Sequence, residues 1–263
     1  LKPLMSKKIG LALSGGGGRG FAHVGVLKAL VENNIPIDMI AGTSAGSIVG
    51  AAFATGMSID EIIAMCGRVR WLNMIRPSFG LRGVLSSAPM GKFLNREFPE
   101  HRFENLKTKF AAVGYDCESG KEIVFTDNGD LIFAVRASCA VPGVFEPLTD
   151  DNDKLLVDGG VVSQMPVETV RAMGADVVIA VDLLACGSTF RSRPSTLFGM
   201  LIQSAMSLLR TASGYQGSKA DLVIEPQIAH IRPDRISNRI ECIKLGERAA
   251  LAMLDEIKTL ASK

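Results

Sequence analysis

Two glycine-rich stretches near the start of the chain contain the residue types that acyl transfer requires. Residues 14–20 (SGGGGRG) follow a short apolar run, so they are predicted to open a helix and to leave backbone N–H groups without partners. Residues 42–46 (GTSAG) match the G-x-S-x-G pattern, which places a serine hydroxyl on a sharp turn between a strand and a helix. Unpartnered amides stabilise an oxyanion, and an exposed serine can accept an acyl group. Together the two stretches predict acyl transfer through a serine ester.

Ser44 is the predicted nucleophile of the second stretch. Gly42 and Gly46 flank it and let the backbone turn sharply without Cβ clashes. The alternative is a serine that only caps the next helix, because short G-x-S-x-G matches also arise by chance.

The glycine run also has two interpretations. As an oxyanion hole it would use the amides of Gly15, Gly16, Gly17 and Gly18. As a dinucleotide-binding loop it would use the G-x-G-x-x-G pattern that ends at Gly20, with Asp38 as the ribose partner, and the protein would be an oxidoreductase. We favour the oxyanion hole, since a pyrophosphate loop leaves the serine elbow unexplained.

The general base is the less obvious half of the site. The chain has three histidines: His23 on the helix after the glycine run, His101 in a charged stretch, and His230. Only His230 follows the serine late enough for the chain order of ordinary α/β-hydrolases, and its neighbours give no catalytic signal. We therefore expect a His230→Ala variant to keep most of the activity.

Asp158 is better placed to act as the base. It ends a predicted strand, so it projects at the carboxyl edge of the sheet, where α/β active sites form. Gly159 and Gly160 follow it and leave the space beside it open. The plain alternative is that Asp-Gly-Gly forms a turn.

The elements that must position these residues alternate between strand and helix. The predicted strands are 9–13, 37–41, 154–157, 177–181 and 222–225, with a hairpin of 110–115 and 122–126, and the predicted helices are 21–31, 47–55, 58–69, 130–140, 167–173 and 237–260. This order predicts an α/β fold with a mostly parallel central sheet and helices on both faces. No linker or repeat interrupts it, so we expect one domain over 1–263.

Two apolar segments lie outside this alternation. Residues 70–88 are predicted to form a long apolar loop that serves as an acyl-chain wall or lid. A later amphipathic helix carries the stripe Phe198, Leu201, Ile202, Ala205, Leu208 and Leu209. Both segments are open to three interpretations: contact with a membrane surface, a core or subunit interface, or shielding of an acyl chain.

Composition excludes several classes of protein. The 263 residues are 47% hydrophobic and 21% charged with a net charge of +2, which argues against a nucleic-acid binder. The five cysteines show no C-x-x-C spacing and the acidic residues lack calcium-loop spacing, so we expect no metal and no cofactor. A short polar N-terminus and the lack of a long apolar run favour a cytoplasmic protein without a signal peptide or membrane span, with membrane association left open.

The motifs together resemble the patatin-like phospholipase family. Residues 14–20, 42–46 and 158–160 resemble its three signatures in order, 19–27 (RGFAHVGVL) resembles its bacterial members and the neuropathy-target-esterase branch, and 137–147 resembles the segment ahead of the aspartate. The resemblance covers about residues 8–181, and residues 182–263 are expected to complete the domain with helices. It implies a three-layer α/β/α sandwich. Departures from the family pattern are Ser14, where plant patatins carry Asp, and residues 163–166 (SQMP), where many relatives have Asn ahead of the proline.

The resemblance also implies residue roles. Ser44 is the nucleophile and Asp158 the base of a dyad without histidine; the glycine run forms the oxyanion hole; Arg19 has a structural or electrostatic role. The expected activity is hydrolysis of fatty-acyl esters of phospholipids or lysophospholipids. The alternative is a non-catalytic regulatory or lipid-binding module of the same fold. The expected partner is the lipid or acyl-ester substrate, and the sequence leaves the oligomeric state open.

Overall fold

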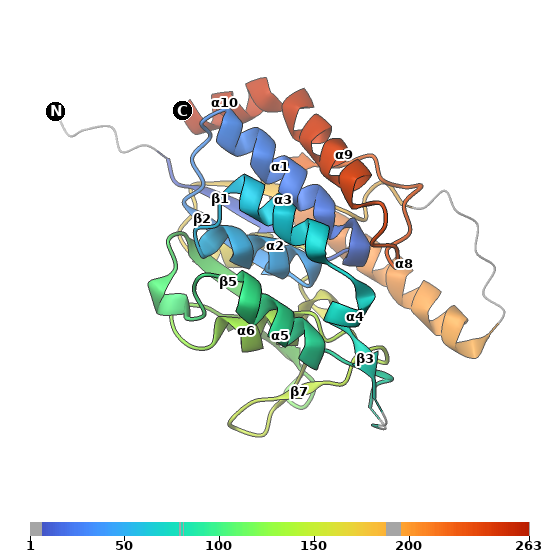
Figure 1. The fold of residues 1–263 in the computed structure, drawn as a ribbon. Coiled ribbons are helices and arrows are strands. Elements are labelled where there is room, and N and C mark those ends of the chain that lie inside the picture. The colour runs from blue at the N-terminus through green and yellow to red at the C-terminus, as the bar shows by residue number, and fades with distance from the viewer. Residues whose placement is uncertain (1–6, 79, 81, 188–195, 263) are drawn as a thin grey trace.

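An eight-stranded sheet forms the centre of the part of the chain that the structure, a computed structural model, describes: residues 7–78, 80, 82–187 and 196–262 (Figure 1). Its strand order is β10-β9-β1-β2-β5-β8-β7, and β6 pairs with β5. Five strands run parallel: β1 (Ile9–Leu13), β2 (Met39–Thr43), β5 (Lys109–Asp116), β9 (Val177–Val181) and β10 (Leu222–Ile224). Three are antiparallel to their neighbours: β6 (Lys121–Phe125), β7 (Leu148–Thr149) and β8 (Leu155–Asp158). The mostly parallel sheet is as predicted.

Helices cover both faces of the sheet. They are α1 (Phe21–Glu32), α2 (Ala45–Ala54), α3 (Ile59–Arg68), α4 (Trp71–Met74), α5 (Ala88–Glu97), α6 (Leu131–Ser138), α7 (Val167–Ala172), α8 (Leu197–Gly217), α9 (Arg239–Ala252) and α10 (Leu254–Ser262), with short 3-10 helices η1 (Gly17–Gly20), η2 (Phe103–Asn105) and η3 (Gly159–Val161). Along β1, Ile9, Leu11 and Leu13 join the core under α1, α2 and α3, while Ala12 joins the core under α7. The alternation of side chains along a strand thus divides the core into two layers.

Local sequence signals fix several helix ends. Ser58 caps α3 and accepts a hydrogen bond from the Glu61 amide, while the Glu61 carboxylate accepts one from the Ser58 amide, which is a complete capping box. Asp130 caps α6 through the amide of Phe133. These hydrogen bonds explain why both helices begin where the sequence predicts.

The structure corrects two predicted elements. Residues 70–88 do not form a plain loop, because they contain α4 and a small two-stranded sheet of β3 (Arg76–Pro77) and β4 (Leu85–Ser86). The Val84 and Leu85 amides donate to the Val144 carbonyl, a tertiary contact that no local pattern predicts. The predicted closing helix 237–260 is two helices, because the chain breaks at Met253, whose φ of −110° is not helical.

Helix α8 projects from the body of the molecule at its N-terminal end (Figure 1). Leu197, Leu201 and Leu208 on this helix are 78%, 60% and 71% exposed, so they do not belong to the core. The side chains of Phe198 and Ile202, which the sequence places in the same stripe, lie outside the described residues. No described helix combines the length and the hydropathy that crossing a membrane would require.

Candidate active site

Ser44 occupies a strained turn between β2 and α2. Its φ of 51° and ψ of −120° lie in a region that residues other than glycine rarely adopt, at a cost of about 1–3 kcal/mol. The flanking glycines are required by close approach: a Cβ on Gly42 would lie 2.5 Å from the backbone of Gly46, and a Cβ on Gly46 would clash with the Leu13 carbonyl. The predicted elbow is therefore present, and its backbone leaves room for glycine alone at both flanking positions.

Two buried serines hold the elbow in place. The Ser44 amide donates to Ser138 Oγ at 2.9 Å, and Ser47 Oγ donates to the Ser44 carbonyl at 2.6 Å. Ser138 was not singled out from the sequence, although it lies in the stretch 137–147 that resembles the family. A hydroxyl-bearing residue in that stretch was the signal that could have identified it.

The topology brings Asp158 to Ser44. On β5, Val113 pairs with Thr43 of β2, and the next residue, Gly114, pairs with Asp158 of β8. Strand β6 pairs with the same two β5 residues along the opposite edge. Strands β2 and β8 therefore share one edge of β5 and meet end to end, with their carboxyl ends facing each other. The structure thus brings together the two predicted dyad residues.

Asp158 is buried beside the serine. Burial raises the pKa of its carboxyl to about 6, while hydrogen bonds from the Gly160 amide and the Ser44 hydroxyl act in the opposite direction and lower it. The Gly160 amide donates to Asp158 Oδ1 at 2.7 Å. A Cβ on Gly159 would clash with the Val113 carbonyl, so glycine is required for the turn to pack against β5. The carboxyl is thus a stronger base than an exposed aspartate and is still ionised at neutral pH.

The glycine run lies beside this pair and uses its amides unequally. The Gly15 amide donates to the Gln164 carbonyl at 3.0 Å, and the Gly18 amide donates to the Pro233 carbonyl at 2.6 Å. Gly16 precedes η1 and Gly17 opens it, and the first amides of a helix have no acceptor within that helix. Within the described part of the chain, no residue accepts a hydrogen bond from either of these two amides.

Arg19 supports the glycine run from within the core. The side chain is 1% exposed, and its guanidinium donates to the carbonyls of Leu183, Gly187 and Ile231 at 2.8–3.1 Å. It therefore connects the glycine run to segments far along the chain.

His23 holds the start of the run. Its ring Nε2 lies 2.8 Å from the Ser14 carbonyl, which requires this nitrogen to carry the proton. Full burial lowers the His23 pKa to about 4, so the ring is neutral at physiological pH. The ring is therefore a buried packing element that binds the Ser14 carbonyl.

The remaining sequence candidates lie elsewhere. His230 is exposed and pairs with Glu241 at 2.8 Å, and His101 contacts the Asn95 carbonyl at 3.0 Å. Asp38 precedes β2 and accepts a hydrogen bond from the Ile9 amide at the start of β1. Asp38 therefore lies at the amino ends of the strands, whereas the glycine run lies at their carboxyl ends. The prediction that Asp38 contacts a ribose next to the glycine run is wrong. Among the described residues, no three potential metal ligands cluster.

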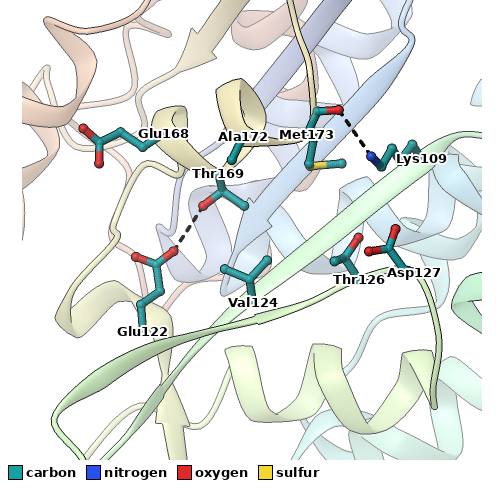
Figure 2. Close-up of a pocket in the computed structure, with 9 residues that line it drawn as sticks. All are labelled: Lys109, Glu122, Val124, Thr126, Asp127, Glu168, Thr169, Ala172 and Met173. Carbon is teal, nitrogen blue, oxygen red and sulfur yellow. Dashed lines mark hydrogen bonds between the residues drawn. The ribbon is translucent and has the colours of Figure 1, made fainter.

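A hollow of about 400 Å³ lies between α7 and the β5–β6 hairpin (Figure 2). Figure 2 shows Glu122 and Thr169 pointing toward each other, with the Thr169 hydroxyl donating to the carboxylate at 3.1 Å. Burial raises the pKa of Glu122, and nearby Glu168 raises it further. None of the predicted site residues lines this hollow.

Comparisons with known proteins agree with the sequence motifs. The chain matches the family model of patatin-like phospholipase over residues 11–171. It is 36% identical over 192 residues to patatin-like phospholipase domain-containing protein 7 of Rattus norvegicus, covering 68% of this chain and 14% of that protein. An uncharacterized NTE family protein of Mycobacterium bovis is 35% identical over 181 residues, covering 68% of this chain and 49% of that protein. The chain thus matches less than half the length of these curated relatives.

A solved structure shows the same arrangement of elements. The crystal structure of VipD from Legionella pneumophila matches with a TM-score of 0.58 at 15% identity, covering 95% of this chain and 67% of that chain. At this identity the likeness is one of fold.

Proposed function

The chain belongs to the patatin-like phospholipase family, and from this premise we propose that it is a serine hydrolase of fatty-acyl esters in phospholipids or lysophospholipids. The observation that carries the proposal is that Ser44, on a strained elbow, lies beside the buried carboxyl of Asp158, whose pKa is raised. A hydroxyl needs a base to become a nucleophile, and this carboxylate is the base beside it.

The reaction follows from this geometry. Asp158 accepts the Ser44 proton as Oγ attacks the ester carbonyl carbon, and the carbonyl oxygen takes the negative charge. When the bond to the leaving alcohol breaks, the proton passes from Asp158 to that alcohol, which departs as the lysophospholipid or the glycerophosphodiester. Water then gives a proton to Asp158 and attacks the acyl-serine carbonyl; as the fatty acid leaves, Asp158 returns the proton to Ser44 Oγ.

The oxyanion is the second requirement. Proton transfer from serine to aspartate is unfavourable, so the charge on the carbonyl oxygen must be strongly stabilised. We propose that the amides of Gly16 and Gly17 provide this stabilisation, because those of Gly15 and Gly18 already donate to carbonyls. One oxyanion donor is typically worth on the order of 10²–10³ in rate.

The proposal is tested by incubation with a fluorophosphonate probe and measurement of the intact mass. Wild-type protein should gain one adduct, and Ser44→Ala should gain none. Folded wild-type protein without an adduct, in detergent and with lipid vesicles, would contradict the proposal and favour the non-catalytic lipid-binding module.

We further propose that the projecting part of α8 meets the lipid surface that holds the substrate. No charged residue occurs between Leu197 and Leu209, and Leu197, Leu201 and Leu208 are largely exposed. At its inner end, Leu209 Cδ2 would lie 3.8 Å from a Cβ on Gly160, next to the base. The apolar helix therefore runs from solvent to the edge of the candidate site.

Vesicle binding tests this surface. Leu201→Glu and Leu208→Glu should lose co-sedimentation with phosphatidylcholine vesicles, while hydrolysis of a soluble short-chain ester stays within about twofold. Ile240→Glu is the matched control, because Ile240 on α9 is 65% exposed. A wild-type dimer that Leu208→Glu dissociates, without vesicle binding, would instead assign this face to a second copy of the chain.

A further inference from the structure

Residues 162–165 form a loop that touches all three parts of the candidate site. Thr43, next to the nucleophile, donates through Oγ1 to the Ser163 carbonyl at 2.7 Å. On the side of the base, a Cβ on Gly160 would lie 2.8 Å from Gln164 Oε1. At the glycine run, the Gln164 carbonyl accepts a hydrogen bond from the Gly15 amide at 3.0 Å. This 162–165 loop is therefore the common support of elbow, base and glycine run.

Gln164 makes a second contact with the glycine run through its side chain. Its Nε2 donates to the Gly15 carbonyl at 2.8 Å, and the residue is 3% exposed. Both polar groups of Gly15, the amide and the carbonyl, are thus bound by one residue. A Cβ on Gly15 would lie 2.8 Å from Gln164 Oε1, so a larger residue at this position would have to displace the Gln164 amide.

The planarity of the peptide bond gives this contact a consequence. The Gly15 carbonyl and the Gly16 N–H belong to one trans peptide unit, in which the two groups point in opposite directions. A donor that holds the carbonyl therefore fixes the direction of the amide. The Gly16 N–H is one of the two amides to which we assign oxyanion stabilisation.

We propose that Gln164 is a positioning residue that orients the Gly16 amide toward the oxyanion. The inference rests on the proposed function, which supplies the oxyanion. Gln164 does not touch the reacting atoms; it acts through the Gly15–Gly16 peptide. Its loss should therefore slow the chemical step and leave the base unchanged, since the Gly160 amide, which binds Asp158, is not its partner.

Gln216 provides a matched control on the same loop. It lies on α8, and its Nε2 donates to the Val162 carbonyl at 2.8 Å. Its Oε1 accepts a hydrogen bond from the Met165 amide at 2.9 Å. It supports the 162–165 loop from the side of α8, and neither of its hydrogen bonds goes to Gly15. A general loosening of this loop should thus follow from either substitution, whereas misorientation of Gly16 should follow only from loss of Gln164.

The experiment measures kcat, KM and the pH profile on a soluble short-chain ester for wild type, Gln164→Met and Gln216→Met. Methionine keeps the volume and removes the donor. We expect Gln164→Met to lower kcat about 10- to 100-fold with KM within about twofold and an unchanged pH midpoint. Gln216→Met should lower kcat less than about threefold. If Gln164→Met fails to fold, Gln164→Asn replaces it in the experiment, because its amide is one methylene too short to reach Gly15. The same loss of kcat is expected for it.

Two results would overturn the inference. Gln164→Met with wild-type kcat would show that the Gly15 contact does not orient a catalytic group, and the proposed function would stand. Equal loss of kcat in the Gln164 and Gln216 variants would show that Gln164 only supports the 162–165 loop and does not orient the Gly16 amide. Wild-type protein without turnover or probe adduct would instead remove the proposed function, and this inference with it.

Discussion

In the described part of the chain, two carboxyls that lie beside a hydroxyl have a raised pKa, and only one of these two pairs has the surroundings of an active site. Asp158 with Ser44 lies where β2 and β8 meet, and Glu122 with Thr169 lies in the hollow under α7. In both pairs burial raises the carboxyl pKa, and in both the hydroxyl hydrogen bond lowers it.

The difference lies in the hydroxyl and in the nearby amides. Ser44 has a positive φ in the turn between β2 and α2, whereas Thr169 lies within helix α7. The glycine run adjoins the elbow, because a Cβ on Gly20 would lie 2.5 Å from the Ala45 Cβ. A raised carboxyl pKa does not by itself define an active site; acyl transfer also needs an accessible nucleophile and amide donors for the oxyanion. The predictions below test whether this difference is the functional one.

The largest expected effect is that of Ser44→Ala, which should lower kcat/KM for a short-chain ester by about 10⁴-fold or more, because the acyl acceptor is removed. Thr169→Ala, which removes the hydroxyl of the other pair, should stay within about twofold. Comparable losses in the two variants would contradict the view that only the Ser44–Asp158 pair is catalytic.

Asp158→Asn should lower kcat by about 10³-fold, since an amide cannot accept the serine proton. The folded pKa of about 6 exceeds the ordinary 3.8, so ionising this group costs stability as pH rises between those values. The variant should therefore be more stable than wild type at pH 8, by on the order of 1–3 kcal/mol in urea unfolding. A destabilised variant would mean that the carboxylate supports the fold.

The pH profile of kcat/KM should fall about tenfold per pH unit below about 6, the pKa to which burial raises the Asp158 carboxyl. The sign follows from the role of the group: a general base is lost on protonation, and burial moves that loss to higher pH. Glu122→Gln should leave the midpoint where it is. A midpoint near the ordinary aspartate value of 3.8 would contradict a buried base.

Ser138→Ala should lower kcat about tenfold, because it leaves the Ser44 amide without the acceptor that holds the elbow. Ser213→Ala is the control: it also removes a fully buried hydroxyl, one that donates to Asp182 at 2.9 Å. Equal effects of the two substitutions on kcat would indicate a general loss of packing.

The smallest expected effect is that of Glu122→Gln on the same ester hydrolysis, which should change kcat/KM by less than about twofold. The hollow that Glu122 lines shares no residue with the Ser44 site. A large loss of activity would assign the α7 hollow a part in the reaction.

Much of the fold was predictable because its signals are local. The strand 177–181 and the starts of the helices predicted at residues 58 and 130 depend on neighbouring residues, and the structure confirms them. The segment 70–88 was predicted wrongly because its backbone partner, Val144, lies far along the chain. Ser138 and Gln164 were not assigned roles for the same reason, since their partners Ser44 and Gly15 are distant in sequence.

The sequence by itself determined the serine elbow and the glycine run. Glycine at 42 and 46 is required by backbone contacts that any such turn creates, so the pattern alone carries the prediction. Only the tertiary structure decided what lies beside Ser44. Strand β8 runs antiparallel to β5 and meets β2 end to end. This arrangement depends on the register of three strands. It places Asp158 beside the serine and buries its carboxyl. Long-range register and desolvation are properties of the folded sheet, and no local stretch of sequence encodes them.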